Sequence, residues 1–119
     1  MTKVLIVDDS SFMRALLRNV LNKIGVKDLT EASLGKQAIA EFKKQKYDLV
    51  LLDIILPDIG GEVVLADIMK AKPKPKVVMV TAVGQKPMME KCRKLGVEDY
   101  IVKPFDNKKI EVTIKRVLK

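Results

Sequence analysis

The residue types best suited to chemistry in this sequence are three aspartates, a threonine and a lysine, each directly after a short apolar run. Clustered carboxylates need a counter-charge, because two of them ~4 Å apart repel by ~4 kcal/mol at an effective dielectric constant near ~20. A hard cation with oxygen ligands, Mg²⁺ above all, offsets this repulsion and bridges to phosphate oxygens. The residues are Asp8 and Asp9 after Val4–Val7, Asp53 after Leu49–Leu52, Thr81 after Val77–Val80 and Lys103 after Asp99–Val102.

Together these groups are typical of phosphoryl transfer, in which catalysis is mostly positioning and charge neutralisation. Asp53 is the candidate nucleophile, because a carboxylate can form an aspartyl phosphate. Lys103 and Mg²⁺ would neutralise the phosphoryl oxygens, and the Thr81 hydroxyl could donate a hydrogen bond to one of them. Each residue also has a plainer interpretation: Asp8 and Asp9 as helix caps, Asp53 as a turn residue, and Lys103 as half of a surface ion pair. The functional prediction therefore depends on the fold bringing all five together.

Five strand–helix units are predicted from the apolar pattern, and they would position these residues. The helix starts are marked by serine, proline and aspartate, and two helix ends by Gly25 and Gly96. The predicted strands are Val4–Val7, Lys27–Ala32, Leu49–Leu52, Val77–Val80 and Asp99–Val102. The predicted helices run from Ser10 or Ser11 to Ile24 with a stripe that starts at Phe12, from Gly35 to Lys46, from Gly60 or Gly61 to about Lys72, from Pro87 to Leu95, and from Asp106 or Asn107 to Leu118.

Continuous apolar strands that alternate with amphipathic helices predict an α/β fold, with a parallel sheet covered on both faces. A doubly wound, flavodoxin-like (βα)5 three-layer sandwich has the strand order 2-1-3-4-5, and ligands bind beyond the carboxyl ends of the strands where the order reverses. In that order Asp8, Asp9 and Asp53 would converge in one acidic pocket. Thr81 and Lys103 would stand on its far side.

The length and composition indicate one folded domain. The chain has 119 residues, 48% hydrophobic and 32% charged, with no internal repeat or linker, so we expect a single domain over residues 1–119. The longest apolar runs are four residues, too short to cross a membrane, and no secretory signal precedes Asp8. The single Cys92 fits a reducing compartment, and we expect the protein to be cytoplasmic.

The absence of histidine and the net charge limit the possible functions. With no histidine, the chain has neither a histidine base nor a histidine–cysteine zinc site, and any phosphohistidine must belong to another protein. The net charge of +8 permits acidic partners. Three Phe, two Tyr and no Trp make a base-stacking platform improbable, so no nucleic acid partner is expected. The basic cluster Lys70–Lys76 would lie at the sheet edge opposite the acidic pocket and is assigned no function.

Four segments of the chain, VLIVDDS, LLDIILPDIGG, VTA and YIVKPF, resemble the response-regulator receiver domain of two-component signalling, in that order and over the whole chain. The segment TAVGQ and the lack of an output domain resemble the stand-alone, CheY-like chemotaxis regulators. The resemblance also contributes to the strand order given above. It implies a monomeric phosphorylation switch, not an enzyme that turns over a separate substrate. Its partners would be a CheA-like sensor histidine kinase as phosphodonor and a motility-apparatus or adaptor protein, possibly acidic, as target.

The resemblance also implies roles for individual residues around the metal. Asp53 would be the phosphoacceptor and a metal ligand. Asp9 would bind Mg²⁺ directly and Asp8 mainly through water. The backbone carbonyl of Ile55 would complete the metal site.

The switch residues implied by the resemblance lie in the second half of the chain. Thr81 and Lys103 would be the switch hydroxyl and the phosphate-pairing lysine, and the Lys103–Pro104 peptide would be cis. Tyr100 would turn inward as Thr81 moves toward the phosphate; its plainer interpretation is a half-buried aromatic on an edge strand. The face formed by the fourth helix, fifth strand and fifth helix would bind the target, although its lysines could equally be a solvated surface.

Three positions depart from the usual receiver pattern. Gly60 replaces the acidic or small polar residue that is common before Gly61. Ile55 and Val83 are apolar, each two residues after a site residue, where polar groups help to place the water that removes the phosphate. We therefore expect a comparatively long-lived phosphorylated form.

Three other functions compete with this interpretation. A flavodoxin-like electron carrier would need a phosphate-cradling loop after the first strand, where this chain has two carboxylates. A phosphatase of the haloacid dehalogenase type would place its nucleophile in D-x-D after that strand, where this chain has D-D-S. Within the receiver family, the chain could instead be a phosphorelay intermediate or a regulator outside motility.

Overall fold

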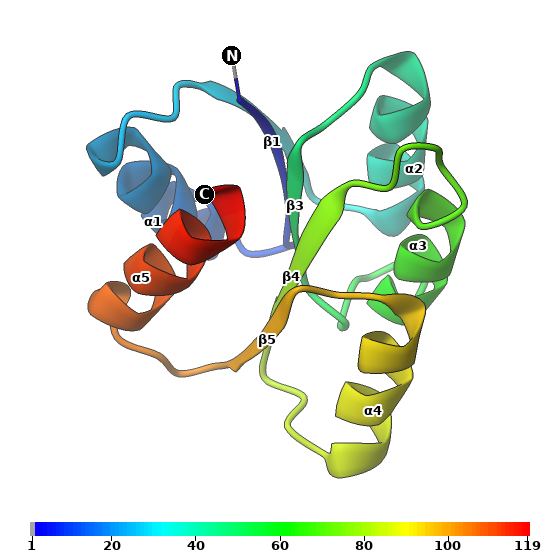
Figure 1. The fold of residues 1–119 in the computed structure, drawn as a ribbon. Helices are drawn as coiled ribbons and strands as arrows, with labels where there is room; N and C mark the ends of the chain where they lie inside the picture. Colours follow the sequence, from blue (N-terminus) through cyan, green and yellow to red (C-terminus); the bar gives the residue numbers. More distant parts are fainter. Residues whose placement is uncertain (1) are drawn as a thin grey trace.

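The strands and helices alternate along the chain in five βα units. The structure, a computed structural model, describes residues 2–119 (Figure 1). The strands are β1 (Lys3–Val7), β2 (Asp28–Ala32), β3 (Leu49–Leu52), β4 (Lys76–Thr81) and β5 (Asp99–Val102). The helices are α1 (Ser11–Lys23), α2 (Gly35–Lys44), α3 (Gly61–Ile68), α4 (Lys86–Leu95) and α5 (Asn107–Leu118).

The strands form one parallel sheet in the order β2-β1-β3-β4-β5, which confirms the predicted topology. The strand order reverses between β1 and β3, where Val7 is paired with Leu52. The loops that leave these two strands therefore start side by side. A crevice at this point is where doubly wound sheets bind their ligands.

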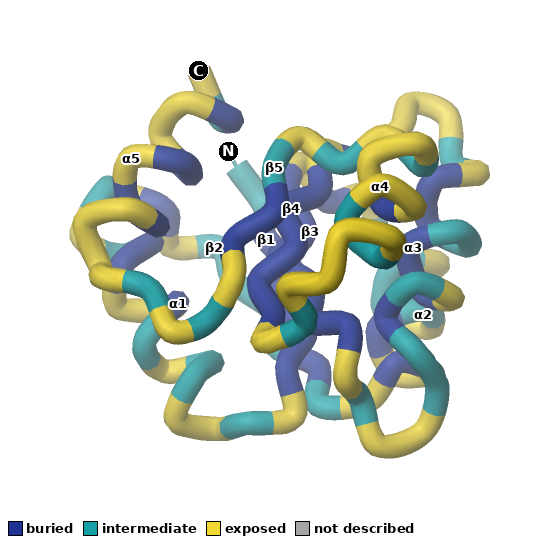
Figure 2. The backbone as a smooth tube through the Cα atoms, turned by 90° about the horizontal axis from the view of Figure 1, so that it is seen from below, coloured by how far each residue is buried: buried dark blue, intermediate teal, exposed yellow. Residues whose placement is uncertain are grey.

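Helices cover both faces of the sheet, and successive strand residues point to opposite faces. α1 and α5 lie on one face, and α2, α3 and α4 lie on the other (Figure 1). In β3, Leu49 and Leu51 pack toward α1 and α5, whereas Val50 and Leu52 pack toward the other three helices. Burial on both sides explains the continuous apolar runs, and the strands are buried between the layers in Figure 2.

The helix caps follow the signals in the sequence. Ser10 caps α1, where its hydroxyl accepts the amide N–H of Met13 at 3.1 Å, and Asp106 caps α5. Gly25 and Gly96 have φ angles of 93° and 104°, in the left-handed region that glycine adopts easily at helix ends.

Two helices end two or more residues earlier than predicted, and α1 ends one residue earlier, at Lys23. α2 ends at Lys44, not Lys46, because Gln45 is already extended. α3 ends at Ile68, not near Lys72, because the amides of Lys70 and Ala71 donate to carbonyls three residues back instead of continuing the helix.

The expected core position of Phe12 is wrong. Its side chain is 75% exposed, because it lies outside the stripe of α1 that buries Leu17, Val20 and Leu21. By contrast, Cys92 on α4 is fully buried. None of the helices described between residues 2 and 119 has the length and apolar character needed to cross a bilayer.

Candidate functional site

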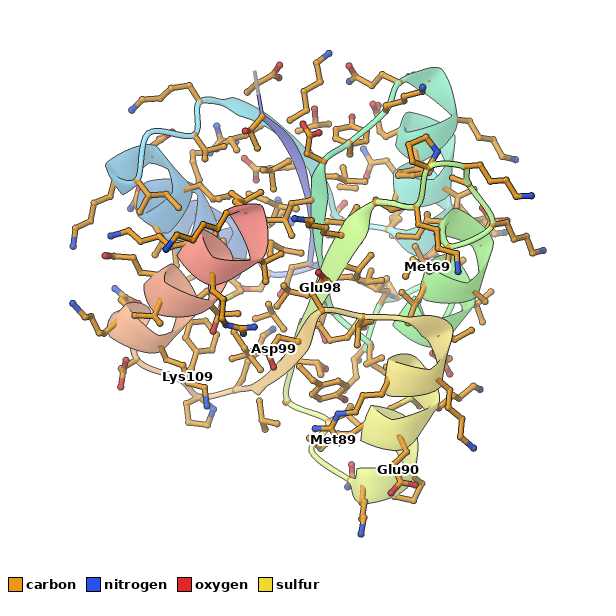
Figure 3. All side chains as sticks on the ribbon, in the orientation of Figure 1. Met69, Met89, Glu90, Glu98, Asp99 and Lys109 are labelled. Carbon is orange, nitrogen blue, oxygen red and sulfur yellow. The ribbon has the colours of Figure 1, made fainter. Side chains whose placement is uncertain are left out.

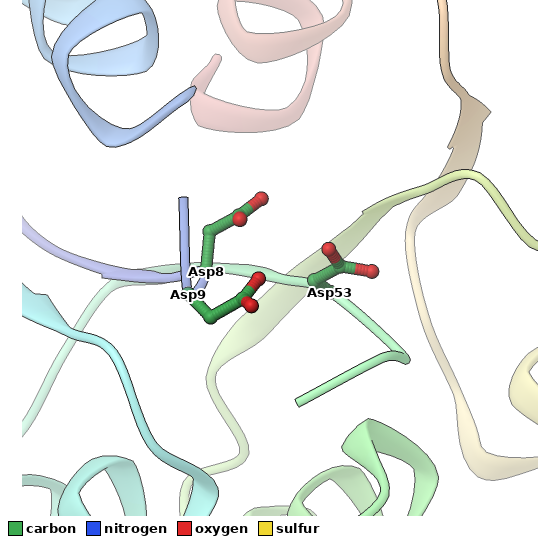
Figure 4. A group of neighbouring side chains, drawn as sticks. All are labelled: Asp8, Asp9 and Asp53. Carbon is green, nitrogen blue, oxygen red and sulfur yellow. The ribbon is translucent and has the colours of Figure 1, made fainter. Parts of the chain in front are cut away.

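Three carboxylates meet at the carboxyl ends of β1 and β3. Each of Asp8, Asp9 and Asp53 offers an oxygen within 4.8 Å of the others, and Figure 4 shows the three side chains grouped together. Asp8 and Asp53 are buried, with 1% and 5% of their surface exposed, whereas Asp9 is exposed to solvent. The fold thus forms the predicted acidic pocket, with one side open to water.

Lys103 provides the positive charge that this cluster needs within the protein. Its ammonium donates to Asp8 Oδ2 at 2.8 Å and to Asp53 Oδ2 at 2.9 Å. The Lys103–Pro104 peptide that leads away from this residue is cis, as expected. With all three carboxylates and the ammonium ionised, the cluster keeps a charge of −2, which is equal and opposite to that of one divalent cation.

Burial and ion pairing shift the protonation of this cluster in opposite directions. Burial raises the pKa of the Asp8 carboxyl, and the hydrogen bond from Lys103 only partly reverses this effect. Burial by itself lowers the pKa of the Lys103 ammonium, but its hydrogen bonds with Asp8 and Asp53 and their negative charges raise that pKa above its ordinary value. Lys103 therefore remains charged at neutral pH.

Backbone hydrogen bonds hold the two buried carboxylates in place. The amide of Asp8 donates to Ala32 on β2, and the amide of Asp53 donates to Val7 on β1, so both residues extend the sheet by one position. The amide of Ser10 donates to Asp8 Oδ1 at 2.9 Å, and that of Ile55 donates to Asp53 Oδ1 at 3.2 Å. Ser10 caps α1, so Asp8 and Asp9 do not serve as its helix caps. Both aspartates therefore remain available as metal ligands.

Thr81 and Tyr100 are joined through one residue of the loop between β4 and α4. The amide of Val83 donates to Thr81 Oγ1 at 3.3 Å, and the Tyr100 hydroxyl donates to the Val83 carbonyl at 2.5 Å. Tyr100 is buried rather than half-buried, and its burial raises the pKa of its hydroxyl to about 12. The amide of Lys103 donates to the Thr81 carbonyl at 2.8 Å. A movement of this loop would therefore act on both side chains.

Sequence reasoning missed two residues that hold the loop between β3 and α3 beside Asp53. A Cβ atom on Gly61 would lie 1.9 Å from the Asp53 carbonyl oxygen, so only glycine fits there. The Asp58 carboxylate accepts the amides of Gly35 and Lys36 at 2.8 and 2.9 Å, which tethers the loop to the start of α2. The glycine pair was a visible signal, but it was interpreted as a helix start and as part of the receiver pattern, not as a close backbone contact.

The pocket fits a hard divalent cation. Its donors are all carboxylate oxygens, its net charge is −2, and the exposed Asp9 leaves one side accessible to the waters that Mg²⁺ retains. Ile55, whose carbonyl was predicted as a further ligand, lies two residues after Asp53 with its side chain 59% exposed.

The sequence also matches a known family over most of its length. The sequence model of the response regulator receiver domain matches residues 4–115. The chemotaxis protein CheY of Thermotoga maritima is 37% identical over 117 residues, which cover 98% of both chains. The transcriptional regulatory protein ResD of Bacillus subtilis is 36% identical over 118 residues, which cover 99% of this chain and 48% of ResD.

Solved structures show the same fold. In a complex of CheX and CheY from Borrelia burgdorferi with BeF3 and Mg²⁺, a chain with 31% sequence identity superposes with a TM-score of 0.92. The superposition covers 99% of this chain and 90% of that one.

Proposed function

Because the chain belongs to the response regulator receiver domain family, we propose that Asp53 accepts a phosphoryl group from a sensor histidine kinase in a Mg²⁺-dependent reaction. The observation that carries the proposal is the cluster of Asp8, Asp9 and Asp53 at the switch point of the sheet, in which Lys103 bridges Asp8 and Asp53. The similarity, at 31% identity, to a chain of the complex of CheX and CheY with BeF3 and Mg²⁺ supports it.

In the proposed step, an oxygen of Asp53 attacks the phosphorus of a phosphohistidine on the kinase. The new P–O bond forms as the P–N bond breaks, and the imidazole nitrogen leaves with the electron pair. The Lys103 Nζ atom lies 2.9 Å from Asp53 Oδ2, so the ammonium is positioned to pair with the phosphoryl oxygens. This chain has no histidine, so the donor must be another protein.

Asp8, Asp9, Asp53 and the Ile55 carbonyl would hold the metal. When bound, Mg²⁺ would neutralise charge on the carboxylates and on the phosphoryl oxygens. Asp8 is fixed by Ser10 and Lys103, whereas Asp9 is exposed and free to take a metal position.

The switch would pass from Thr81 to Tyr100 through Val83. A Thr81 hydroxyl that moves toward the phosphoryl group to donate to it would move away from the Val83 amide, from which it now accepts a hydrogen bond. The loop would then shift, and with it the carbonyl that accepts from Tyr100. The two states would thus differ in the loop and in the adjoining α4 and β5.

The face of α4, β5 and α5 is the proposed target surface. Its charged residues are mostly basic, which suits an acidic partner. Arg116 pairs with Asp99, and Lys115 pairs with Glu111 at 3.3 Å, so part of this charge is already compensated. The exposed basic residues are Lys86, Lys91, Arg93, Lys94, Lys108, Lys109, Lys115 and Arg116.

We propose a target in the motility apparatus or an adaptor protein of chemotaxis, working in the cytoplasm. The support is similarity to CheY of T. maritima over 98% of both chains, and a free Cys92 that suits a reducing compartment. The alternative is a phosphorelay or a regulatory role outside motility. ResD favours this alternative, since its receiver part is almost as similar to the chain and belongs to a transcriptional regulator.

The acceptor chemistry is tested with acetyl phosphate, a small phosphodonor that needs no kinase. The protein is incubated with acetyl phosphate and Mg²⁺ and analysed by intact mass spectrometry, with EDTA and the Asp53→Asn variant as controls. We expect one added phosphoryl group, which is lost in EDTA and in Asp53→Asn. A folded protein that binds Mg²⁺ and gains no phosphoryl group would contradict the proposal.

A further inference from the structure

A second charged site lies at the opposite end of the sheet from Asp53. A cavity of about 590 Å³ opens between the end of α2, the loop that precedes β4, and the starts of β3 and β4. Its walls carry six exposed lysines, and we call it the basic cavity: Lys43, Lys44, Lys46, Lys72, Lys74 and Lys76. The volume falls in the range of small-molecule sites in proteins.

Most of this positive charge is uncompensated. Lys44 pairs with Glu41 at 3.3 Å, and Lys76 donates to the Val117 carbonyl at 2.7 Å. The one acidic residue of the lining, Asp48, accepts the backbone amide of Lys3. Four lysines of the basic cavity remain: Lys43, Lys46, Lys72 and Lys74. None of them forms an ion pair with any residue between 2 and 119.

Stabilisation of helix ends accounts for only part of this cluster. Lysines in the last turn of a helix interact favourably with its dipole, which explains Lys43 and Lys44 on α2. Lys72 and Lys74 belong to no helix and still line the cavity from the other side. A concave site lined by one sign of charge concentrates the field and raises the local concentration of anions.

The wall opposite α2 is a stiffened segment. Lys72, Lys74 and Lys76 alternate with two prolines, whose rings fix their φ angles. Pro75 is buried, and the amide of Lys76 donates to the Asp48 carbonyl at 3.1 Å. A backbone restrained in this way loses less conformational entropy when its side chains bind a ligand.

Two aromatic residues complete the lining. The rings of Phe42 and Tyr47 stack with centroids 6.2 Å apart, and both residues line the cavity. Gln45 donates to the Tyr47 hydroxyl at 2.9 Å and keeps that ring in place. The site thus combines an apolar surface with ammonium groups on two walls.

We propose that the basic cavity binds a small ligand that carries two or more linked phosphate groups. Six ammonium groups and one carboxylate give it a charge of +5, more than a single phosphate can balance. Two walls of lysines suit a chain of phosphates between them, and the partly exposed ring of Phe42, backed by the buried Tyr47, offers a small apolar surface for an attached base. The ligand could be inorganic tripolyphosphate or a nucleoside polyphosphate, which share this chemistry.

The basic cavity is independent of the proposed phosphorylation site. β3 begins beside Asp48 in the cavity and ends before Asp53, and β4 begins at Lys76 and ends at Thr81. At ~3.3 Å per residue, the five residue steps from Asp48 to Asp53 separate the two sites by ~17 Å. Asp53→Asn, which removes the phosphoacceptor, should therefore still bind the polyphosphate. Figure 3 shows side chains with nitrogen tips around much of the surface, so the test needs a control for general charge effects.

Isothermal titration calorimetry of the full chain tests the proposal, with tripolyphosphate, ATP and AMP at physiological salt and with EDTA to remove divalent ions. We expect saturable binding of one tripolyphosphate or ATP, and weaker binding of AMP. Two double variants should each weaken tripolyphosphate binding by about tenfold or more: Lys72→Gln with Lys74→Gln, and Lys43→Gln with Lys46→Gln. Each variant loses charge-assisted hydrogen bonds from one wall of the cavity. Lys27→Gln with Lys36→Gln, outside the cavity, removes equal charge and should change the affinity by less than about twofold.

Equal binding of ATP and tripolyphosphate would identify the phosphates as the ligand, and tighter binding of ATP would add a contact to the base. Loss of affinity in the control pair as large as in the cavity pairs would overturn the proposal. Absence of saturable binding of tripolyphosphate and of ATP would also overturn it. All substituted lysines are exposed, and thermal unfolding verifies that each variant is folded.

Discussion

At the scale of single residues, Lys103 stabilises the candidate site before any ligand arrives. Its ammonium bridges Asp8 and Asp53, and its pKa is raised, so this stabilisation is fully present below its ordinary pKa of 10.5 and is lost only as the pH rises through the higher folded-state value. Phosphorylation would give the same ammonium a new partner. One charged group can thus serve both the resting and the phosphorylated state.

Also at this scale, Ile55 and Val83 are apolar, so neither position offers a polar group that could place a water beside the proposed acceptor. We predict that Ile55→Asn combined with Val83→Glu speeds the loss of phosphate from Asp53 by about tenfold or more, because oriented polar groups hold the attacking water in position. The decay of the phosphorylated protein is followed by intact mass spectrometry after removal of the phosphodonor. Ile55→Val, which stays apolar, is the control, and a double variant that decays at its rate would refute the idea.

At the scale of elements, the loop between β3 and α3 is held at both ends. Gly61 packs against the backbone of Asp53, its amide donates to the Ile54 carbonyl at 2.7 Å, and Asp58 ties the loop to α2. The next two predictions test these contacts separately.

The adjacent glycines at the start of α3 should respond differently to a side chain. Gly61→Ala should lower the free energy of unfolding by about 3 kcal/mol, because its Cβ would collide with the backbone of Asp53 and Ile54. Gly60→Ser should be tolerated, since its Cβ meets only the flexible carboxylate of Glu62, which can move into solvent. Chemical denaturation measures both, and equal losses would show that the close contact at Gly61 is unimportant.

Asp58 should stabilise the protein in a pH-dependent way. Its hydrogen bonds with the amides of Lys36 and Gly35 lower the pKa of its carboxyl, so its contribution is fully present above the ordinary value of 3.8 and is lost as the pH falls through the lower folded-state value. Asp58→Asn should therefore unfold at a lower temperature than the parent at pH 7, with a difference that shrinks toward pH 3. Thermal unfolding across this range checks it, and a constant difference would contradict it.

At the scale of the whole molecule, the parallel sheet separates two charged ends. The acidic pocket lies beyond the carboxyl ends of the strands, and the basic cavity lies at their amino ends. The net charge of +8 is therefore unevenly distributed over the molecule. The acidic pocket carries negative charge and would bind a cation, whereas the basic cavity carries positive charge and would bind an anion. Buried strands between the two ends give the molecule a rigid centre.

Phosphorylation should change amide hydrogen exchange on one side of this centre. We predict altered exchange in residues 82–85, α4 and β5, because Thr81 and Tyr100 both bond to Val83, and unchanged exchange in the buried β1 and β3. Mass spectrometry compares the protein with and without acetyl phosphate, and Asp53→Asn should show no difference. Changes confined to the loop after Asp53 would rule out this route.

Local pattern was sufficient to predict the strands and the residues at their ends. The apolar runs before Asp53 and Thr81 are continuous because both faces of the sheet are covered, and that pattern is visible within a few residues. Helix ends were less predictable, since α3 stops through turns whose hydrogen bonds compete with the helix.

Contacts between distant residues were decided only in the tertiary structure. Lys103 and Asp8 are 95 residues apart in the chain, and Asp58 is 23 residues from Gly35, so no local pattern identifies the partners. The exact fit of Gly61 against Asp53 and the basic cavity between α2 and the loop before β4 arise in the same way. The sequence thus specified which chemical groups the sheet carries, because burial acts on each strand locally. Packing decided which of them meet, because that depends on how the strands are ordered side by side.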